Sequence, residues 1–102
     1  MVELAPRQRQ YLKGLAHKLR PVVQIGADGP RESVHAAIEQ ALEDHELIKV
    51  QVSKSFEGER AVLGQEIAQS AEAALCQQIG RVFVLYRPRR KPAKGRKAIT
   101  LP

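Results

Sequence analysis

Two glycines separated by two residues stand between a β-branched stretch and a predicted helix. The segment reads VVQIGADGP, from Val22 to Pro30, and Arg31 follows it. Because glycine has no Cβ, it allows positive φ and lets a phosphate approach the backbone, and the N-terminus of a helix attracts anions. The segment lacks the other residues of a P-loop or a dinucleotide fingerprint. It therefore indicates either a plain strand-to-helix turn or a loop that holds an RNA backbone. The candidate residues of this loop are Gly26, Ala27, Asp28, Gly29 and Arg31.

Basic residues supply the other candidates for anion binding. The net charge is +6, and no acidic residue follows Glu72. Such a charge favours polyanionic partners, with nucleic acid before an anionic membrane. A predicted amphipathic helix begins at Pro6 and is stopped by Pro21, and it carries cations on both sides of its leucine stripe. The candidates on and after this helix are Arg9, Lys13 and Arg20 on one side and Arg7 and Lys18 on the other. Arg81, at a predicted hairpin turn, is a further candidate, and Phe56 in a polar loop is a candidate for contact with a base.

The remaining segments predict how these residues are positioned. A buried strand is expected at 21–25, a helix at 31–45 and an alternating strand at 47–53. A third helix at 61–74 and a hairpin of strands 74–79 and 81–87 around Gly80 complete the order. The two strand–helix–strand units predict parallel pairing through right-handed crossovers, and the hairpin adds an antiparallel strand. The expected fold class is α/β, an α+β two-layer domain of order α-β-α-β-α-β-β with a mixed four-stranded sheet.

The domain organisation follows from length and composition. The 102 residues suit a single domain, which we place at 1–87. Residues 88–102 are rich in proline and cations and are predicted to form a flexible basic tail. The N-terminal segment lacks the long apolar core of a signal peptide, and no stretch reaches the ~20 apolar residues of a membrane span. We therefore expect a cytoplasmic protein.

Three segments carry a resemblance to a known family. YLKGLAHKLRPVVQIGADG, AIEQALEDHELIKVQV and QIGRVFVLYRP resemble the CRM domain, the chloroplast RNA splicing and ribosome maturation module, in its stand-alone bacterial form called YhbY. The resemblance extends from about Arg9 to Arg87. It implies an RNA-binding protein of ribosome assembly that associates with precursors of the large subunit. The implied fold is similar to the C-terminal domain of translation initiation factor three.

The same resemblance implies where RNA would bind. The family's G-x-x-G loop matches Gly26–Gly29, and the basic surface of its first helix matches Arg9, Lys13, Lys18 and Arg20. The chain departs from the family at two places in this loop. Pro30 and Arg31 stand where many members have leucine and a helix-capping threonine, and Ala27 stands where many have lysine. Arginine cannot cap a helix as threonine does, but it brings a charge to the loop.

Other chemistry has weak support in the sequence. His17, His35 and His45 lack metal-ligand spacing, and the single Cys76 has no second thiol, so we expect no metal site and interpret Cys76 as a small buried hydrophobe in a reducing compartment. The chain has no Gly-x-Ser-x-Gly elbow, so an enzyme is not expected. The acidic residues near the end of the second helix, Glu43, Asp44 and Glu46, are interpreted as a solvated polar surface.

The leading hypothesis is a non-catalytic, monomeric protein that binds ribosomal RNA in precursors of the large subunit. It needs no cofactor, small-molecule substrate or membrane. One alternative is a basic adaptor whose tail docks on acidic protein partners or anionic surfaces. A DNA-binding module is less favoured, because no helix-turn-helix spacing is found.

Overall fold

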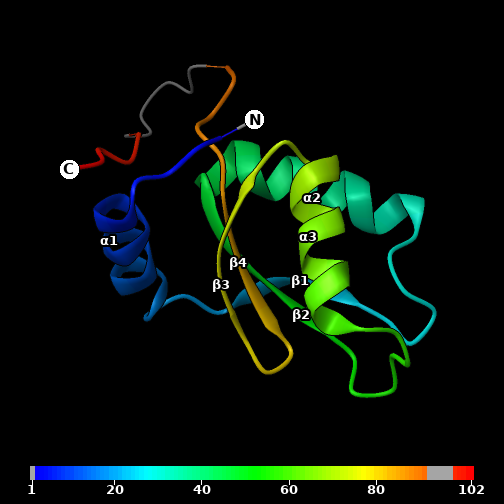
Figure 1. Ribbon diagram of the computed structural model, residues 1–102. Helices are drawn as coiled ribbons and strands as arrows, with labels where there is room; N and C mark the ends of the chain where they lie inside the picture. Colours follow the sequence, from blue (N-terminus) through cyan, green and yellow to red (C-terminus); the bar gives the residue numbers. More distant parts are fainter. Residues whose placement is uncertain (1, 92–97) are drawn as a thin grey trace.

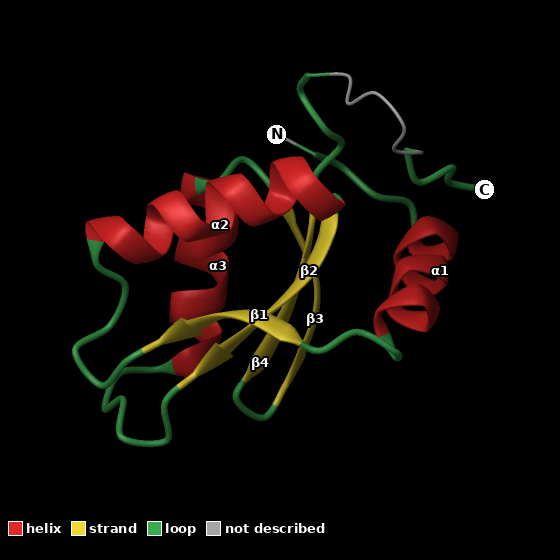
Figure 2. Cartoon of the chain, turned by 180° about the vertical axis from the view of Figure 1, so that it is seen from behind, coloured by secondary structure: helices red, strands yellow, loops and turns green. Residues whose placement is uncertain are grey.

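The computed structural model describes residues 2–91 and 98–102, so part of the predicted tail, 92–97, lies outside the described residues. The order of elements is the predicted one. They are α1 (Pro6–Ala16), β1 (Pro21–Ile25), α2 (Glu32–His45), β2 (Leu47–Val52), α3 (Arg60–Ser70), β3 (Ala74–Ile79) and β4 (Val82–Tyr86). Helices α2 and α3 cover one face of the sheet, and α1 lies against the other face (Figures 1 and 2). The fold is thus the predicted α+β domain with a mixed four-stranded sheet.

The strand order is β1-β2-β4-β3. Strands β1 and β2 pair in parallel as predicted, but the expected parallel pairing of β2 with β3 is wrong. Strand β4 lies between them and pairs antiparallel with both. Residues Phe83 to Tyr86 of β4 are almost completely buried. A strand this apolar is stabilised at an interior position of the sheet, where both of its faces are covered.

The larger core lies between the sheet and the helices α2 and α3. The predicted alternation of β2 holds, because Ile48, Val50 and Val52 all point into this core. Phe83 is fully buried at its centre. A Cβ added to Gly64 of α3 would lie 3.1 Å from the Phe83 ring. Gly64 therefore lets α3 approach β4 closely, which offsets its low helix propensity.

A second core lies under α1 and includes both ends of the described chain. Leu12 and Cys76 are buried in it. Terminal side chains pack against the same cluster, namely Val2, Leu4, Ile99 and Leu101. Burial raises the pKa of the Cys76 thiol to about 11, although the charges of Arg9 and Lys13 oppose the rise. This cysteine is the buried hydrophobe that the sequence predicts, and its thiol stays protonated at neutral pH.

Two helices end earlier than the sequence predicts. Helix α1 ends at Ala16, so Lys18 and Arg20 lie beyond the helix, and His17 is only its C-terminal cap. Helix α3 ends at Ser70 rather than at residue 74. At the end of α3, Glu72 takes a positive φ of 54° and the amide of Ala73 donates to the Ala68 carbonyl at 2.8 Å. Helices commonly end in this way, with one residue in the left-handed conformation, but that residue is usually a glycine. Here it is Glu72, so the sequence gives no signal that the helix ends.

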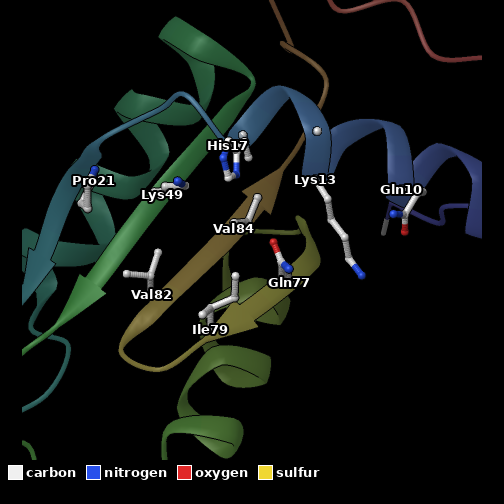
Figure 3. A pocket seen from close by; sticks show the side chains of 11 residues that line it. Gln10, Lys13, His17, Pro21, Lys49, Gln77, Ile79, Val82 and Val84 are labelled. Carbon is white, nitrogen blue, oxygen red and sulfur yellow. The ribbon is translucent and has the colours of Figure 1, made fainter.

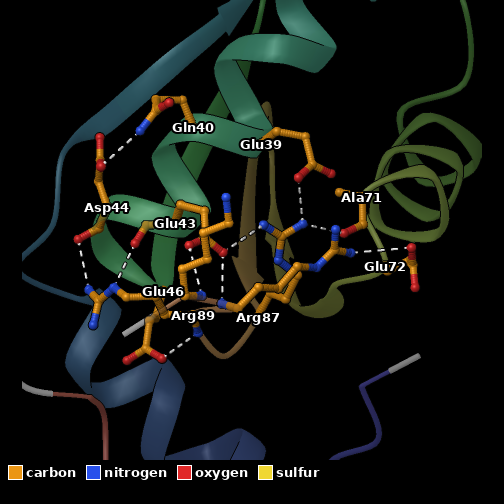
Figure 4. A network of polar contacts seen from close by, with 11 residues as sticks. Glu39, Gln40, Glu43, Asp44, Glu46, Ala71, Glu72, Arg87 and Arg89 are labelled. Atoms are coloured by element: carbon orange, nitrogen blue, oxygen red, sulfur yellow. Dashed lines mark hydrogen bonds and ion pairs between the residues drawn. The ribbon is translucent and has the colours of Figure 1, made fainter. Parts of the chain in front are cut away.

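The acidic cluster at the end of α2 is not a solvated surface, which corrects the sequence interpretation. Only 2% of Glu46 is exposed, and its carboxylate accepts hydrogen bonds from the amides of Arg89 (2.6 Å) and Ile99 (2.7 Å). Glu43 accepts from the amides of Arg90 and Lys91 (Figure 4). The hydrogen bond from Arg90 is the main cause that lowers the pKa of Glu43, although burial opposes it. The carboxylates of α2 therefore hold both described parts of the basic tail.

Residues 88–91 and 98–102 thus lie against the domain, where the sequence predicts a flexible arm. The side chain of Arg89 donates to the carbonyls of Glu43 and Asp44 at the C-terminus of α2. Such contacts satisfy carbonyls that have no partner within the helix and place a cation at the negative end of its dipole. At the far end, the Pro102 carbonyl accepts from Gln8 of α1.

Two further features of the described chain bear on its chemistry. None of the helices it contains has the length and apolar character needed to cross a bilayer. Within residues 2–91 and 98–102, histidine, cysteine, aspartate and glutamate side chains form no group of three that could hold a metal ion.

Candidate nucleic-acid interface

Three connections meet at one edge of the sheet. They are the loop after β1, the loop after β2 and the turn between β3 and β4, which Figure 2 shows at the edge away from the termini. The amide of Ser53 donates to the Ile25 carbonyl at 2.7 Å, and the amide of Val52 donates to the Arg81 carbonyl at 2.8 Å. These two bonds connect all three segments. Residues that are far apart in the sequence are therefore held together at this edge.

The connections surround a polar hollow of about 590 Å³, which we call the loop hollow. Its polar lining comes from Gln24, Gly26, Gln51, Ser53, Lys54 and Arg81. The hollow brings together two predicted candidates, Gly26 and Arg81. It also includes Lys54, which the sequence analysis missed, although the parallel β1–β2 pair predicted from sequence would have placed residue 54 beside the glycine loop. The lining has two cations and no acid among the described residues.

Glycine stands at the two positions of the loop for different structural reasons. Gly29 has a φ of +85°, and a Cβ there would lie 3.4 Å from the ring of Phe56. Gly26 has no atom within 4 Å of the position of a Cβ and no positive φ. Phe56 is half-buried and packs against the larger core, so it is not the freely exposed aromatic that the sequence suggests. Conformation and packing therefore explain the glycine at position 29. At position 26 the lack of a side chain leaves the backbone accessible to a ligand.

This difference predicts that the two alanine substitutions have unequal effects on stability. Gly29→Ala is expected to lower the free energy of unfolding by about 1–2 kcal/mol, because an L-residue is strained at this φ. Gly26→Ala is expected to change it by less than about 0.5 kcal/mol, as for an open surface site. Urea denaturation of both variants measures these values. Equal losses for the two variants would contradict the assignment.

Arg31 does not stand as a free cation in the loop. Its guanidinium pairs with the Asp28 carboxylate at 2.5 Å, and both side chains are more than 70% exposed. Helix α2 begins at Glu32, and Arg31 at its N-cap position makes no side-chain capping bond. An exposed pair of this kind contributes little to stability. Asp28 therefore offsets much of the charge that Arg31 brings to the loop.

The predicted basic residues of the first helix do not form one surface. Arg9 donates to the Leu75 carbonyl at 2.5 Å and is partly buried. Lys18 is exposed beyond the helix, and Arg20 lines a different, apolar hollow. Lys13 alone among the four lines a groove of about 710 Å³ between α1 and the sheet, which we call the α1 groove. Figure 3 shows Lys13, His17, Lys49 and Gln77 around this groove.

Comparison with known proteins identifies the family to which the chain belongs. The family model of the CRS1 / YhbY (CRM) domain matches residues 4–87. The chain is 47% identical over 88 residues to a Haemophilus influenzae protein named "RNA-binding protein", covering 86% of this chain and 89% of that protein. It is 34% identical over 99 residues to the Bacillus subtilis "Probable RNA-binding protein YqeI", covering 97% and 99%.

The three-dimensional comparison agrees. The solution structure of SAV1595 from Staphylococcus aureus superposes with a TM-score of 0.78 and 32% identity, covering 98% of this chain and all of that one. The chain is thus a small α+β domain with two cations in its loop hollow. The chain belongs to the CRS1 / YhbY (CRM) domain family.

Proposed function

We propose that the protein binds RNA through the loop hollow, and that its target is ribosomal RNA in precursors of the large ribosomal subunit, whose assembly it assists in the cytoplasm. It acts as a monomer and without catalysis. Two curated relatives carry RNA-binding protein names. The ribosomal target is what the resemblance to the chloroplast RNA splicing and ribosome maturation module implies. The RNA-binding surface belongs to the domain within residues 1–87.

The observation that carries this proposal is the meeting of Gly26, Lys54 and Arg81 in one hollow. Gly26 offers a backbone without a Cβ, and the two side chains offer positive charge with no acid beside them in the lining. Phosphate groups are bound by such combinations of cations and accessible backbone amides. The remaining predicted residues, Arg9, Lys18, Arg20 and the Arg31–Asp28 pair, are assigned to weaker, peripheral attraction.

Binding of this kind is docking on the RNA backbone. Contacts to phosphate position a protein on nucleic acid but carry no sequence information. Affinity on a single strand then falls with salt at a slope of about −0.7 per phosphate contact. We therefore expect strong salt dependence and little sequence preference from the loop hollow itself.

A salt titration with two charge-matched variants tests the proposal. Lys54→Glu with Arg81→Glu is expected to reduce affinity for large-subunit rRNA fragments about tenfold or more and to make the salt slope shallower by about 1.4, because two phosphate contacts are lost. Arg7→Glu with Arg90→Glu changes net charge equally, but neither residue lines the loop hollow. Equal losses for both pairs would show that only net charge matters and would refute the site.

The adaptor alternative loses support from the contacts of the tail. In the described part of the tail, Arg89 and Arg90 contact carbonyls or a carboxylate of the same chain. Those cations are already engaged, so they are poorly placed to dock on an acidic partner.

A further inference from the structure

The open face of the sheet carries a regular arrangement of side chains between the α1 groove and the loop hollow. Strand register places two cross-strand rows on this face. The row nearer α1 consists of Gln77, Val84 and Lys49. The row nearer the loops consists of Ile79, Val82, Gln51 and Gln24. Because residues two apart on a strand share a face, the rows are neighbours, and the second row borders both hollows.

The chemistry of this face changes from its ends to its middle. Lys13 and Lys49 lie at the α1 end, and Lys54 and Arg81 lie at the loop end. Between them are amide and aliphatic side chains, including Ile79, which is 62% exposed (Figure 3). Among the described residues that line either hollow, none is acidic. The cations at the two ends suit phosphates, and the groups between them suit neutral, planar and polar ligands.

Glutamine amides in the middle of a cationic track suit unpaired nucleotide bases. A carboxamide both donates and accepts hydrogen bonds, as the edges of bases do. In a duplex these edges are occupied by pairing or lie in grooves that side chains reach poorly, whereas single strands expose them. The aromatic rings that commonly stack on bases are absent from the open part of this face, because Phe83 points into the larger core and Tyr86 is buried under α1.

We infer that this face binds a short single-stranded RNA segment that crosses the sheet from the α1 groove to the loop hollow. The inference rests on the proposed function and extends it. Phosphates contact the cations at the two ends, and the bases contact Gln77, Gln51 and Gln24 between them. The glutamines, rather than the glycine loop, then supply preference for unpaired RNA and for particular bases.

The test separates contacts to bases from contacts to phosphates. Binding is measured for a nine-nucleotide single-stranded RNA and for an abasic strand of the same length, with wild type and with Gln51→Met plus Gln77→Met. Methionine keeps the length and shape of glutamine but lacks the amide. Gln40→Met on α2, at the opposite face of the sheet, is the matched control, and thermal unfolding checks that every variant folds.

The double variant is expected to bind the base-containing strand about fivefold or more weakly, since one amide–base contact contributes about 1 kcal/mol or more. Its affinity for the abasic strand is expected to stay unchanged. An equal loss for both strands, or no loss for either, would overturn the inference. If the glutamine variant has no effect while Lys54→Glu with Arg81→Glu still weakens binding about tenfold or more, this inference fails and the proposed function stands. If neither variant affects binding, both fail.

Discussion

A chain that ends at Arg87 is expected to lose about 3 kcal/mol or more of its free energy of unfolding. The truncation removes the amides of Arg89 and Ile99, which are the hydrogen-bond donors to the buried carboxylate of Glu46. It also removes Ile99 and Leu101 from the second core. Taking away the partners of a buried charge costs about 3–5 kcal/mol. For a domain of this size each kcal/mol shifts Tm by about 4–8 °C, so calorimetry should show a decrease of about 12 °C or more.

A second substitution distinguishes loss of these contacts from a general effect of shortening. Glu46→Gln in the full chain is expected to destabilise, because a charge-assisted acceptor of two amides is replaced by a weaker one. In the truncated chain the same substitution is expected to stabilise, because it removes a carboxylate that has lost its donors. Opposite signs in the two chains support the role of Glu46. A truncated chain with unchanged Tm would contradict it.

The backbone at Glu46 supports the same interpretation. This residue has a φ of 64°, a conformation in which a side chain other than glycine is strained. A glycine would be the easier choice at the end of a helix, but it could not supply the buried carboxylate. The position of Glu46 also has a practical consequence. Truncation at residue 88 changes stability as well as charge, so a test of the tail in RNA binding should use Lys94→Gln, Arg96→Gln and Lys97→Gln in the full chain.

The Arg87→Met variant is expected to lose about 3 kcal/mol of stability. Only 2% of Arg87 is exposed, and its Nη1 donates to Glu39 at 2.8 Å and to the Ala71 carbonyl at 2.9 Å. Its Nη2 lies 3.5 Å from a Glu43 oxygen. Methionine fills similar space but leaves the buried Ala71 carbonyl without this donor, which costs about 1–3 kcal/mol. It also leaves the partly exposed carboxylates of Glu39 and Glu43 without this cation. Denaturant unfolding measures the loss.

Arg90→Met is the matched control, because Arg90 makes an exposed ion pair with Glu72. Its loss is expected to stay below about 1 kcal/mol. The pH dependence gives a second readout. Because the pKa of Glu43 is lowered in the folded state, its ionised carboxylate stabilises the fold at pH values above the ordinary pKa of 4.5. This stabilisation is lost as the pH falls through the folded-state pKa. Since Arg87 helps to lower this pKa, Arg87→Met should show a smaller loss of stability on acidification. Similar losses for Arg87→Met and Arg90→Met would refute the buried role.

The sequence predicts well those features that depend on neighbouring residues. Apolar spacing along α2 and alternation along β2 are local consequences of which side chains face a core, and both are confirmed. The positions at which helices end are less predictable. Glu72 ends α3 without the glycine that would signal it, so the helix was expected to continue to residue 74. The need for glycine at position 64 could not be predicted either, because it comes from the ring of Phe83 on another element.

The candidate site was only partly predictable for the same reason. Gly26 can be selected from the sequence because it is a glycine in a predicted loop, and Arg81 because it is a cation at a predicted turn. Their meeting with Lys54 depends on the strand order β1-β2-β4-β3, which places three connections at one edge. The order depends on β4 being the most buried strand, a property of the whole sheet.

The sequence is enough to predict the succession of helices and strands, the family resemblance and the excess of positive charge. Which of these charges remain available to a ligand depends on the tertiary structure. Arg87 and Arg89 are held by groups of α2, and Arg31 is paired with Asp28. Lys54 and Arg81 line an open hollow, and none of the described residues in its lining is acidic. Charges interact through space over a few ångströms, and only the folded chain sets those distances.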